Sequence, residues 1–119
     1  MKITTSLKKN HEFKRLYSKG KSAASQYVAI YCRRNGKKDN RLGVTVSTKL
    51  GGAVVRNRIR RRLKEIYRTN EDKLTVGYDI VIVARMKSRS SGFREMEASV
   101  LSLLRKLTII PDNGAGGSA

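Results

Sequence analysis

The sequence predicts an α/β protein, a single two-layer sandwich with its elements in the order α-β-β-α-β-α. Residues 25–34 and 42–47 alternate in polarity with a period of two, which is typical of strands with one buried face. Residues 53–69 and 93–107 repeat apolar side chains every three or four positions, which is typical of amphipathic helices. A chain of 119 residues can bury one modest core but not two. We therefore expect one mostly antiparallel central sheet with helices packed on one face.

The first helix is expected to follow a flexible basic arm over residues 1–9. Asn10 belongs to the residue types that cap helices, and apolar residues follow at helical spacing until Gly20. Two of them, Phe13 and Tyr17, have two interpretations. They pack in the core, or they form a partly exposed aromatic pair that stacks on unpaired bases.

The next two elements are strands joined by a turn that contains Asn-Gly, which predicts an antiparallel hairpin. On the face away from the core, Tyr27, Ala29 and Tyr31 of the first strand are expected beside the small residues Gly43 and Thr45 of the second. These side chains predict a shallow trough with aromatic walls. Such a trough suits an extended single strand of RNA better than a rigid duplex.

A basic helix over residues 53–69 is the most informative element. The Gly51-Gly52 pair provides the turn into it. Its expected buried stripe is Val55, Ile59, Leu63 and Ile66, with Tyr67 at the margin. Basic side chains occupy most of the remaining circumference, and most of them are arginine, whose planar fork grips phosphate bidentately. A merely solvated helix face usually mixes signs. The pattern therefore indicates a polyanionic partner.

The last third of the chain predicts a buried strand over 78–84, a basic loop, and a core-packed helix from Phe93 to about Leu107, capped by Ser90 or Ser91. We expect one RNA-binding domain over residues 10–110. Residues 111–119, rich in Gly, Ala and Ser, predict a flexible tail.

Composition narrows the function classes. The net charge of +18, from 27 Lys and Arg against 9 Asp and Glu, favours a counter-charged partner. The single cysteine, Cys32, excludes an internal disulfide and fits a cytoplasmic location. No apolar run could span a membrane. Metal-ligand motifs, a phosphate-binding P-loop and clustered carboxylates are also missing, so we expect no catalytic residues in the protein.

The run from Arg41 to Ser47, followed by Lys49 to Arg58, resembles the signature of the bacterial ribonuclease P protein subunit, and Arg56-Asn57-Arg58 resembles its "RNR" motif. The resemblance extends over about residues 7–107. It implies a fold like domain 2 of the fifth small-subunit ribosomal protein, with a left-handed βαβ crossover through the basic helix. Sequence pattern alone predicts the right-handed form.

The resemblance also implies a function, assistance in the endonucleolytic removal of the 5′ leader from precursor tRNA. The active site and most of the bound Mg²⁺ would belong to a catalytic RNA, which is the first partner. Precursor tRNA is the second partner. We expect no association with a membrane and no obligate protein partner. The residues expected to bind the RNA subunit are Arg56, Asn57, Arg58, Arg60, Arg61, Lys64 and Arg68. Those expected to bind the leader are Phe13, Tyr17, Tyr31 and Lys49. One alternative is a small basic ribosomal protein or another structural RNA-binding protein. The other is a self-sufficient nuclease, and the missing metal ligands argue against it.

Overall fold

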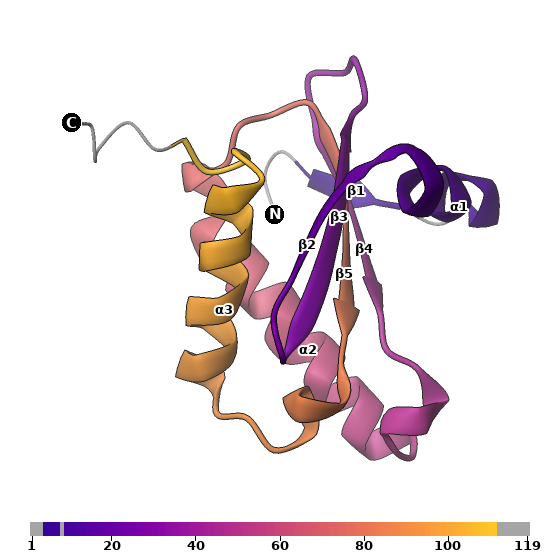
Figure 1. Ribbon diagram of the computed structural model, residues 1–119, viewed down its shortest axis with the longest axis vertical. Helices are drawn as coiled ribbons and strands as arrows, with labels where there is room; N and C mark the ends of the chain where they lie inside the picture. The colour runs from indigo at the N-terminus through magenta and orange to yellow at the C-terminus, as the bar shows by residue number, and fades with distance from the viewer. Residues whose placement is uncertain (1–3, 8, 112–119) are drawn as a thin grey trace.

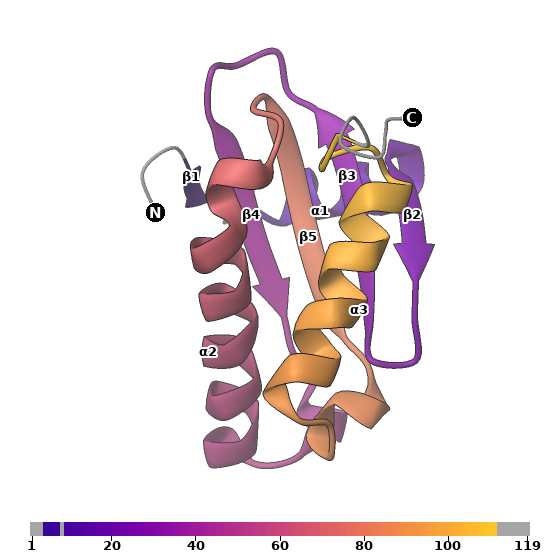
Figure 2. The ribbon, with the colours of Figure 1, turned by 90° about the vertical axis from the view of Figure 1, so that its left-hand side faces the viewer.

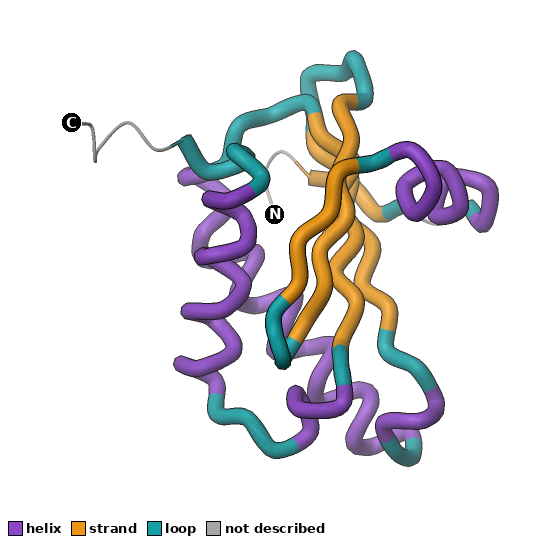
Figure 3. Tube along the Cα trace, in the orientation of Figure 1, coloured by secondary structure: helices purple, strands orange, loops and turns teal. Residues whose placement is uncertain are grey.

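A five-stranded sheet forms the centre of the molecule, and helices cover both of its faces (Figures 1 and 3). The computed structural model describes residues 4–7 and 9–111; residues 112–119 of the expected tail lie outside the described residues. The helices are α1 (Asn10–Lys19), α2 (Ala53–Asn70) and α3 (Phe93–Lys106). The strands are β1 (Thr4–Ser6), β2 (Lys21–Ala24), β3 (Val28–Arg34), β4 (Asn40–Thr45) and β5 (Tyr78–Ala84). Single 3-10 turns are η1 (Thr48–Leu50), η2 (Glu71–Lys73) and η3 (Met86–Arg89).

The strand order β1-β4-β5-β3-β2 confirms the predicted α/β class and corrects the connectivity inside the sheet. The predicted hairpin between β3 and β4 is wrong, because β5 lies between them, antiparallel to β3 and parallel to β4. The reason is burial. Ile80, Val81 and Ile82 of β5 are all fully buried, and a strand that is apolar on both faces belongs in the middle of a sheet.

The edge strands were missed by the sequence pattern, because they are short and largely polar. Thr4–Ser6 pairs with β4 in parallel, so this part of the expected flexible arm is ordered. Lys21–Ala24 pairs with β3 in antiparallel fashion. The sheet is therefore mixed, with two parallel and two antiparallel ladders, rather than mostly antiparallel.

The connection from β4 through α2 to β5 is the left-handed crossover that the resemblance implied. Figure 2 shows α2 in front of the sheet, with β4 and β5 both running downward and β5 to the right of β4. A right-handed connection would place β5 on the left in this view.

The two faces of the sheet have separate apolar cores. Helices α2 and α3 cover one face, whose core includes Ile30, Ile59 and Met96. Helix α1 lies on the opposite face, where Leu7, Leu16 and Val81 form a smaller buried cluster. The expectation of helices on one face only is therefore wrong, because the second apolar face of β5 also requires cover.

The buried stripe of α2 is confirmed with two adjustments. Val55 is only half-buried, since it lies in the first turn, packed against Gly51. Tyr67 is fully buried, and its hydroxyl lies 2.9 Å from the Thr4 hydroxyl and 3.3 Å from the Asn40 amide nitrogen. These bonds tie α2 to β1 and β4.

The helix starts also differ from the expected caps. Asn10 is the first residue of α1 rather than its cap, which is Lys9. Helix α3 is capped by Gly92, not by a serine, and the Gly92 N–H donates to the Glu95 carboxylate at 2.8 Å.

Candidate RNA-binding surfaces

The basic face of α2 brings most of the predicted RNA-binding residues together. A shallow groove of about 410 Å³ is lined by Asn57, Arg60, Arg61 and Lys64, one helical turn apart on the same side. Arg60 donates to the Asn57 side-chain oxygen at 3.0 Å, which orients both groups. Neither arginine nor Lys64 has an acidic partner among the described residues. Their remaining N–H donors are therefore free to meet phosphate oxygens.

The arginines at the two margins of this face are anchored to backbone carbonyls. Arg56 donates through Nε to the Gly51 oxygen at 3.1 Å, and Arg62 donates to the Ser91 oxygen at 3.1 Å. Each bond uses one of five guanidinium donors, so the side chains are held in place while most donors stay available. In Arg56 the "RNR" motif thus has a structural as well as an electrostatic part.

Arg89 is a basic residue that sequence reasoning did not assign to this surface. Arg58 donates to the Arg89 backbone oxygen at 3.3 Å. The two arginines, with Val55, Met86 and Ser90, line a second groove of about 350 Å³. The only signal in the sequence was the basic character of the loop after β5.

Arg68, at the far end of α2, differs from the other predicted residues because its charge is already compensated. It donates twice to Glu65, at 2.9 and 2.7 Å, and both side chains are about half exposed. Hydrogen bonding to Arg68 lowers the pKa of Glu65. A phosphate at Arg68 would have to compete with this carboxylate, so Arg68 is the weakest candidate on the helix.

The predicted aromatic residues form a cluster between α1 and the sheet. The rings of Tyr17 and Tyr31 meet edge to face, with centroids 4.8 Å apart. Phe13 lies directly over Gly43, where an added Cβ would stand 2.7 Å from the ring, so any larger residue would have to push the ring aside. Phe13 is therefore half-buried and partly a packing residue, whereas Tyr17 keeps 43% of its surface exposed. Of the two interpretations, packing describes Phe13 better and exposure describes Tyr17.

The predicted trough is wrong at two of its residues, because Phe13 covers the buried Gly43, and Tyr27 packs against the core on the α2–α3 face, where its hydroxyl donates to Glu95. The part of the α1 face that stays open is called the trough below. Ala29, Val83 and Thr45 are neighbours across β3, β5 and β4, and all three are partly exposed. Helix α1 covers the opposite end of this face (Figure 1). Lys49 is exposed in η1, beyond the end of β4, and is not part of the aromatic cluster.

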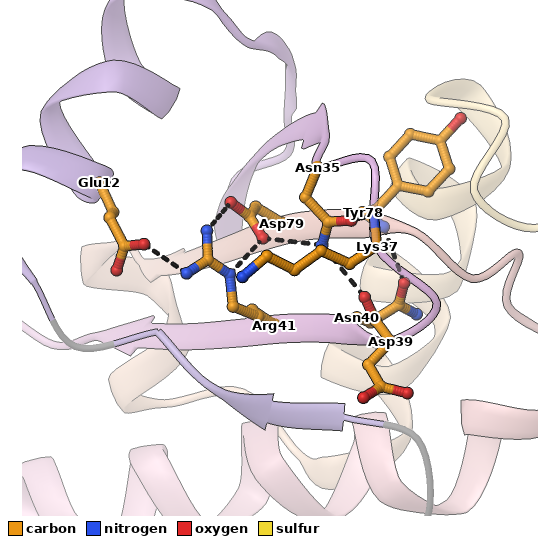
Figure 4. Close-up of polar contacts among 8 residues, drawn as sticks. All are labelled: Glu12, Asn35, Lys37, Asp39, Asn40, Arg41, Tyr78 and Asp79. Atoms are coloured by element: carbon orange, nitrogen blue, oxygen red, sulfur yellow. Dashed lines mark hydrogen bonds and ion pairs between the residues drawn. The ribbon is translucent and has the colours of Figure 1, made fainter.

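A polar network holds α1 on the sheet (Figure 4). Arg41 of β4 donates to both oxygens of Asp79 of β5, at 2.8 and 2.6 Å, and also to the Glu12 carboxylate of α1. Asn35 donates to Asp79 at 3.0 Å. Burial raises the pKa of Asp79, but these hydrogen bonds outweigh it and hold that pKa below its usual value. The network thereby positions the helix that carries Phe13 and Tyr17.

The basic face of α2 defines a class of protein. An exposed, arginine-rich helix without acidic partners for most of its charges, packed on a mixed sheet, is typical of a domain that binds RNA through its phosphates. Within residues 4–7 and 9–111, no three histidine, cysteine or carboxylate side chains gather as metal ligands. No helix in the described part of the chain is long and apolar enough to cross a lipid bilayer.

Comparison with known proteins identifies the family of this chain. The family model of ribonuclease P matches residues 1–108. The ribonuclease P protein component of Alkaliphilus metalliredigens is 43% identical over 110 residues, covering 92% of this chain and 99% of the relative. That of Clostridioides difficile is 41% identical over 107 residues, covering 89% and 94%. This chain belongs to the ribonuclease P protein family.

Solved structures agree with this assignment. The ribonuclease P protein of Staphylococcus aureus superposes with a TM-score of 0.82 at 31% identity, covering 88% of this chain and 96% of that one. The Thermotoga maritima protein gives a TM-score of 0.78 at 31% identity, covering 85% and 96%. The fold class, with its strands and helices, is therefore shared with proteins of this family.

Proposed function

We propose that this chain is the protein subunit of ribonuclease P, a ribonucleoprotein endonuclease that removes the 5′ leader of precursor tRNA. The observation that carries the proposal is the family match over residues 1–108, with Arg56, Asn57 and Arg58 on an exposed basic helix. The separation of that helix from an aromatic trough supports two RNA ligands rather than one.

In this proposal the basic face of α2 binds the RNA subunit. Asn57, Arg58, Arg61 and Lys64 are exposed, and Arg60 is oriented by Asn57. Charge-assisted hydrogen bonds to phosphates are worth about 1.5–3 kcal/mol each, so a few of them suffice for stable assembly. Arg56 holds the turn at Gly51 with one donor and keeps its other donors for phosphate, and Arg68 contributes least because Glu65 neutralises it.

The trough on the α1 face takes the leader. Tyr17 and Tyr31 offer aromatic surface on which bases of any sequence can stack. Small Ala29 and Thr45 allow a strand to lie close to the sheet. Lys49, beyond the end of β4, would meet a leader phosphate. Such contacts tolerate many leader sequences, which a general processing enzyme requires.

Catalysis falls to the RNA subunit. The carboxylates of the described residues do not gather into a metal site, so we assign Mg²⁺ mainly to the RNA. The protein supplies binding and neutralises phosphate charge. Burial raises the pKa of the Cys32 thiol, which keeps it an unreactive core residue and fits our proposal of a cytoplasmic location.

Reconstitution tests the function. With the RNA subunit and Mg²⁺, the protein should promote cleavage of precursor tRNA at the mature 5′ end, and the protein alone should cleave nothing. Cleavage by the protein alone would favour a self-sufficient nuclease. Absence of any effect on the RNA-catalysed reaction, with ribosomal RNA co-purifying instead, would favour a structural ribosomal protein.

A further inference from the structure

We propose that a basic pocket on the α3 face of the sheet binds one unpaired nucleotide of RNA; this inference rests on the proposed function only for the identity of the RNA. The pocket encloses about 210 Å³ where α1, β3 and α3 end and where β2 and β5 begin. The lining residues used below are Lys19, Lys21, Cys32, Arg34, Tyr78 and Leu107.

The rim of the pocket is cationic. Lys19, Lys21 and Arg34 are exposed, and none has an acidic partner among residues 4–7 and 9–111. Three uncompensated charges around one small hollow repel each other, and an anion relieves that repulsion. The rim therefore selects a phosphate group.

The floor of the pocket is apolar. Cys32 and Leu107 are buried core residues, and Tyr78 contributes a half-buried ring. The Arg34 guanidinium lies 5.4 Å from the centre of that ring, so a planar cation and an aromatic face stand side by side. Unpaired RNA bases stack on surfaces of this kind. An apolar floor under a cationic rim matches the two halves of a nucleotide, base and phosphate.

The size of the pocket limits the ligand. Sites for drug-sized molecules enclose about 300–1,000 Å³. A pocket of about 210 Å³ is smaller, which suits a single base and not a dinucleotide cofactor.

The pocket is separate from both surfaces described above. Cys32 and Arg34 alternate with Tyr31 along β3, so they face away from the leader trough. The pocket lies at the β3–β2 side of the sheet, whereas α2 packs at the β4 side. An RNA segment that reaches it must therefore be distinct from those bound by α2 and the trough, and it belongs either to the RNA subunit or to precursor tRNA.

The test is a Lys21→Ala plus Arg34→Ala double variant. Its control, Lys38→Ala plus Arg94→Ala, removes the same charge from two exposed residues outside the pocket. Two affinities are measured, that of the protein for the RNA subunit and that of the preassembled holoenzyme for precursor tRNA. We expect a loss of about tenfold relative to the control in one of the two affinities. The affected arm identifies the source of the nucleotide. Affinities within about twofold of the control in both arms would overturn the proposal.

Two further measurements separate this proposal from its alternatives. RNA that carries 4-thiouridine, irradiated in the wild-type holoenzyme, should crosslink to the peptide containing Tyr78; crosslinks confined to peptides of α1 and α2 would overturn the pocket. Arg34→Lys keeps the charge but not the planar guanidinium beside Tyr78, so it should recover only part of the affinity that Arg34→Ala loses. An Arg58→Ala plus Arg61→Ala variant, run in parallel, tests the α2 surface, so failure of the proposed function is seen independently of the pocket.

Discussion

Replacing Tyr17 separates leader binding from folding more cleanly than any other change in the aromatic cluster. Phe13 is unsuitable, because its ring packs over Gly43 and its loss would leave a cavity. Tyr17 keeps 43% of its surface exposed and touches Tyr31 edge to face. Tyr17→Ala therefore removes an exposed ring face while leaving the buried Leu16 and the α1 network in place.

The magnitude follows from this geometry. Base stacking on an aromatic side chain is worth about 1–3 kcal/mol per base. Tyr31 already contacts the Tyr17 ring in an edge-to-face pair. We therefore expect one base at most to stack on Tyr17, and its loss to cost about 1–2 kcal/mol, or about 5- to 30-fold in affinity. The lost aromatic pair should cost the domain about 0.5–1.5 kcal/mol of stability, which leaves it folded.

The assay compares two substrates of the reconstituted holoenzyme, precursor tRNA and the same tRNA without its leader. Tyr17→Ala should weaken binding of the first and leave the second within about twofold. Tyr17→Phe keeps the ring and serves as the matched control, and circular dichroism melts confirm folding. Equal weakening of both substrates, or equal behaviour of the two variants, would refute the assignment of Tyr17 to the leader.

Three further predictions concern assembly, packing and pH. Arg58→Ala and Arg61→Ala should each weaken binding to the RNA subunit by about 1–2 kcal/mol. Together they should lower the magnitude of the slope of log affinity against log salt concentration from about 4 by about 1–2, and an unchanged slope in a filter-binding titration would show that neither contacts phosphate. In denaturant unfolding, Gly43→Ala should lower the free energy of unfolding by about 1–3 kcal/mol, because the added Cβ would stand 2.7 Å from the Phe13 ring. Gly52→Ala is the control: its added Cβ would meet no atom within 4 Å, so the free energy of unfolding should change by less than about 1 kcal/mol. The pKa of Asp79 is lowered in the folded state, so the stability that its ionised carboxylate contributes is present above the unfolded pKa of about 3.9 and is lost as pH falls through the folded pKa. The melting temperature, measured as a function of pH in acid, should show this loss. Arg41→Gln removes the ion-pair partner of Asp79 and should make the loss smaller.

Local patterns in the sequence determined the elements that have strong periodicity. The stripe of α2 was predicted because apolar side chains at helical spacing must share a face, and Ile59, Leu63 and Ile66 are all fully buried. The same periodicity placed the arginines outward, where charge is cheapest to solvate. The alternation along β3 likewise put Ile30 in the core and Tyr31 on the opposite face.

The tertiary structure alone decided how these elements meet. Strand β5 separates β3 from β4 because it has two apolar faces to bury, a property of the whole sheet and not of the turn that suggested a hairpin. The short edge strands β1 and β2 are too polar and brief to show a period. Their hydrogen bonds come from partners elsewhere in the chain.

The candidate sites divide in the same way. Composition and the "RNR" run predicted the basic face of α2, because charge and helical spacing are properties of one continuous segment. The exposed groove, the pairing of Arg68 with Glu65 and the pocket beside Tyr78 required side-chain geometry. The packing of Phe13 on Gly43 and the bridge from Arg41 to Glu12 join residues 30 and 29 positions apart. Such contacts depend on which segments fold against each other, and periodicity within one segment carries no information about its neighbours in space.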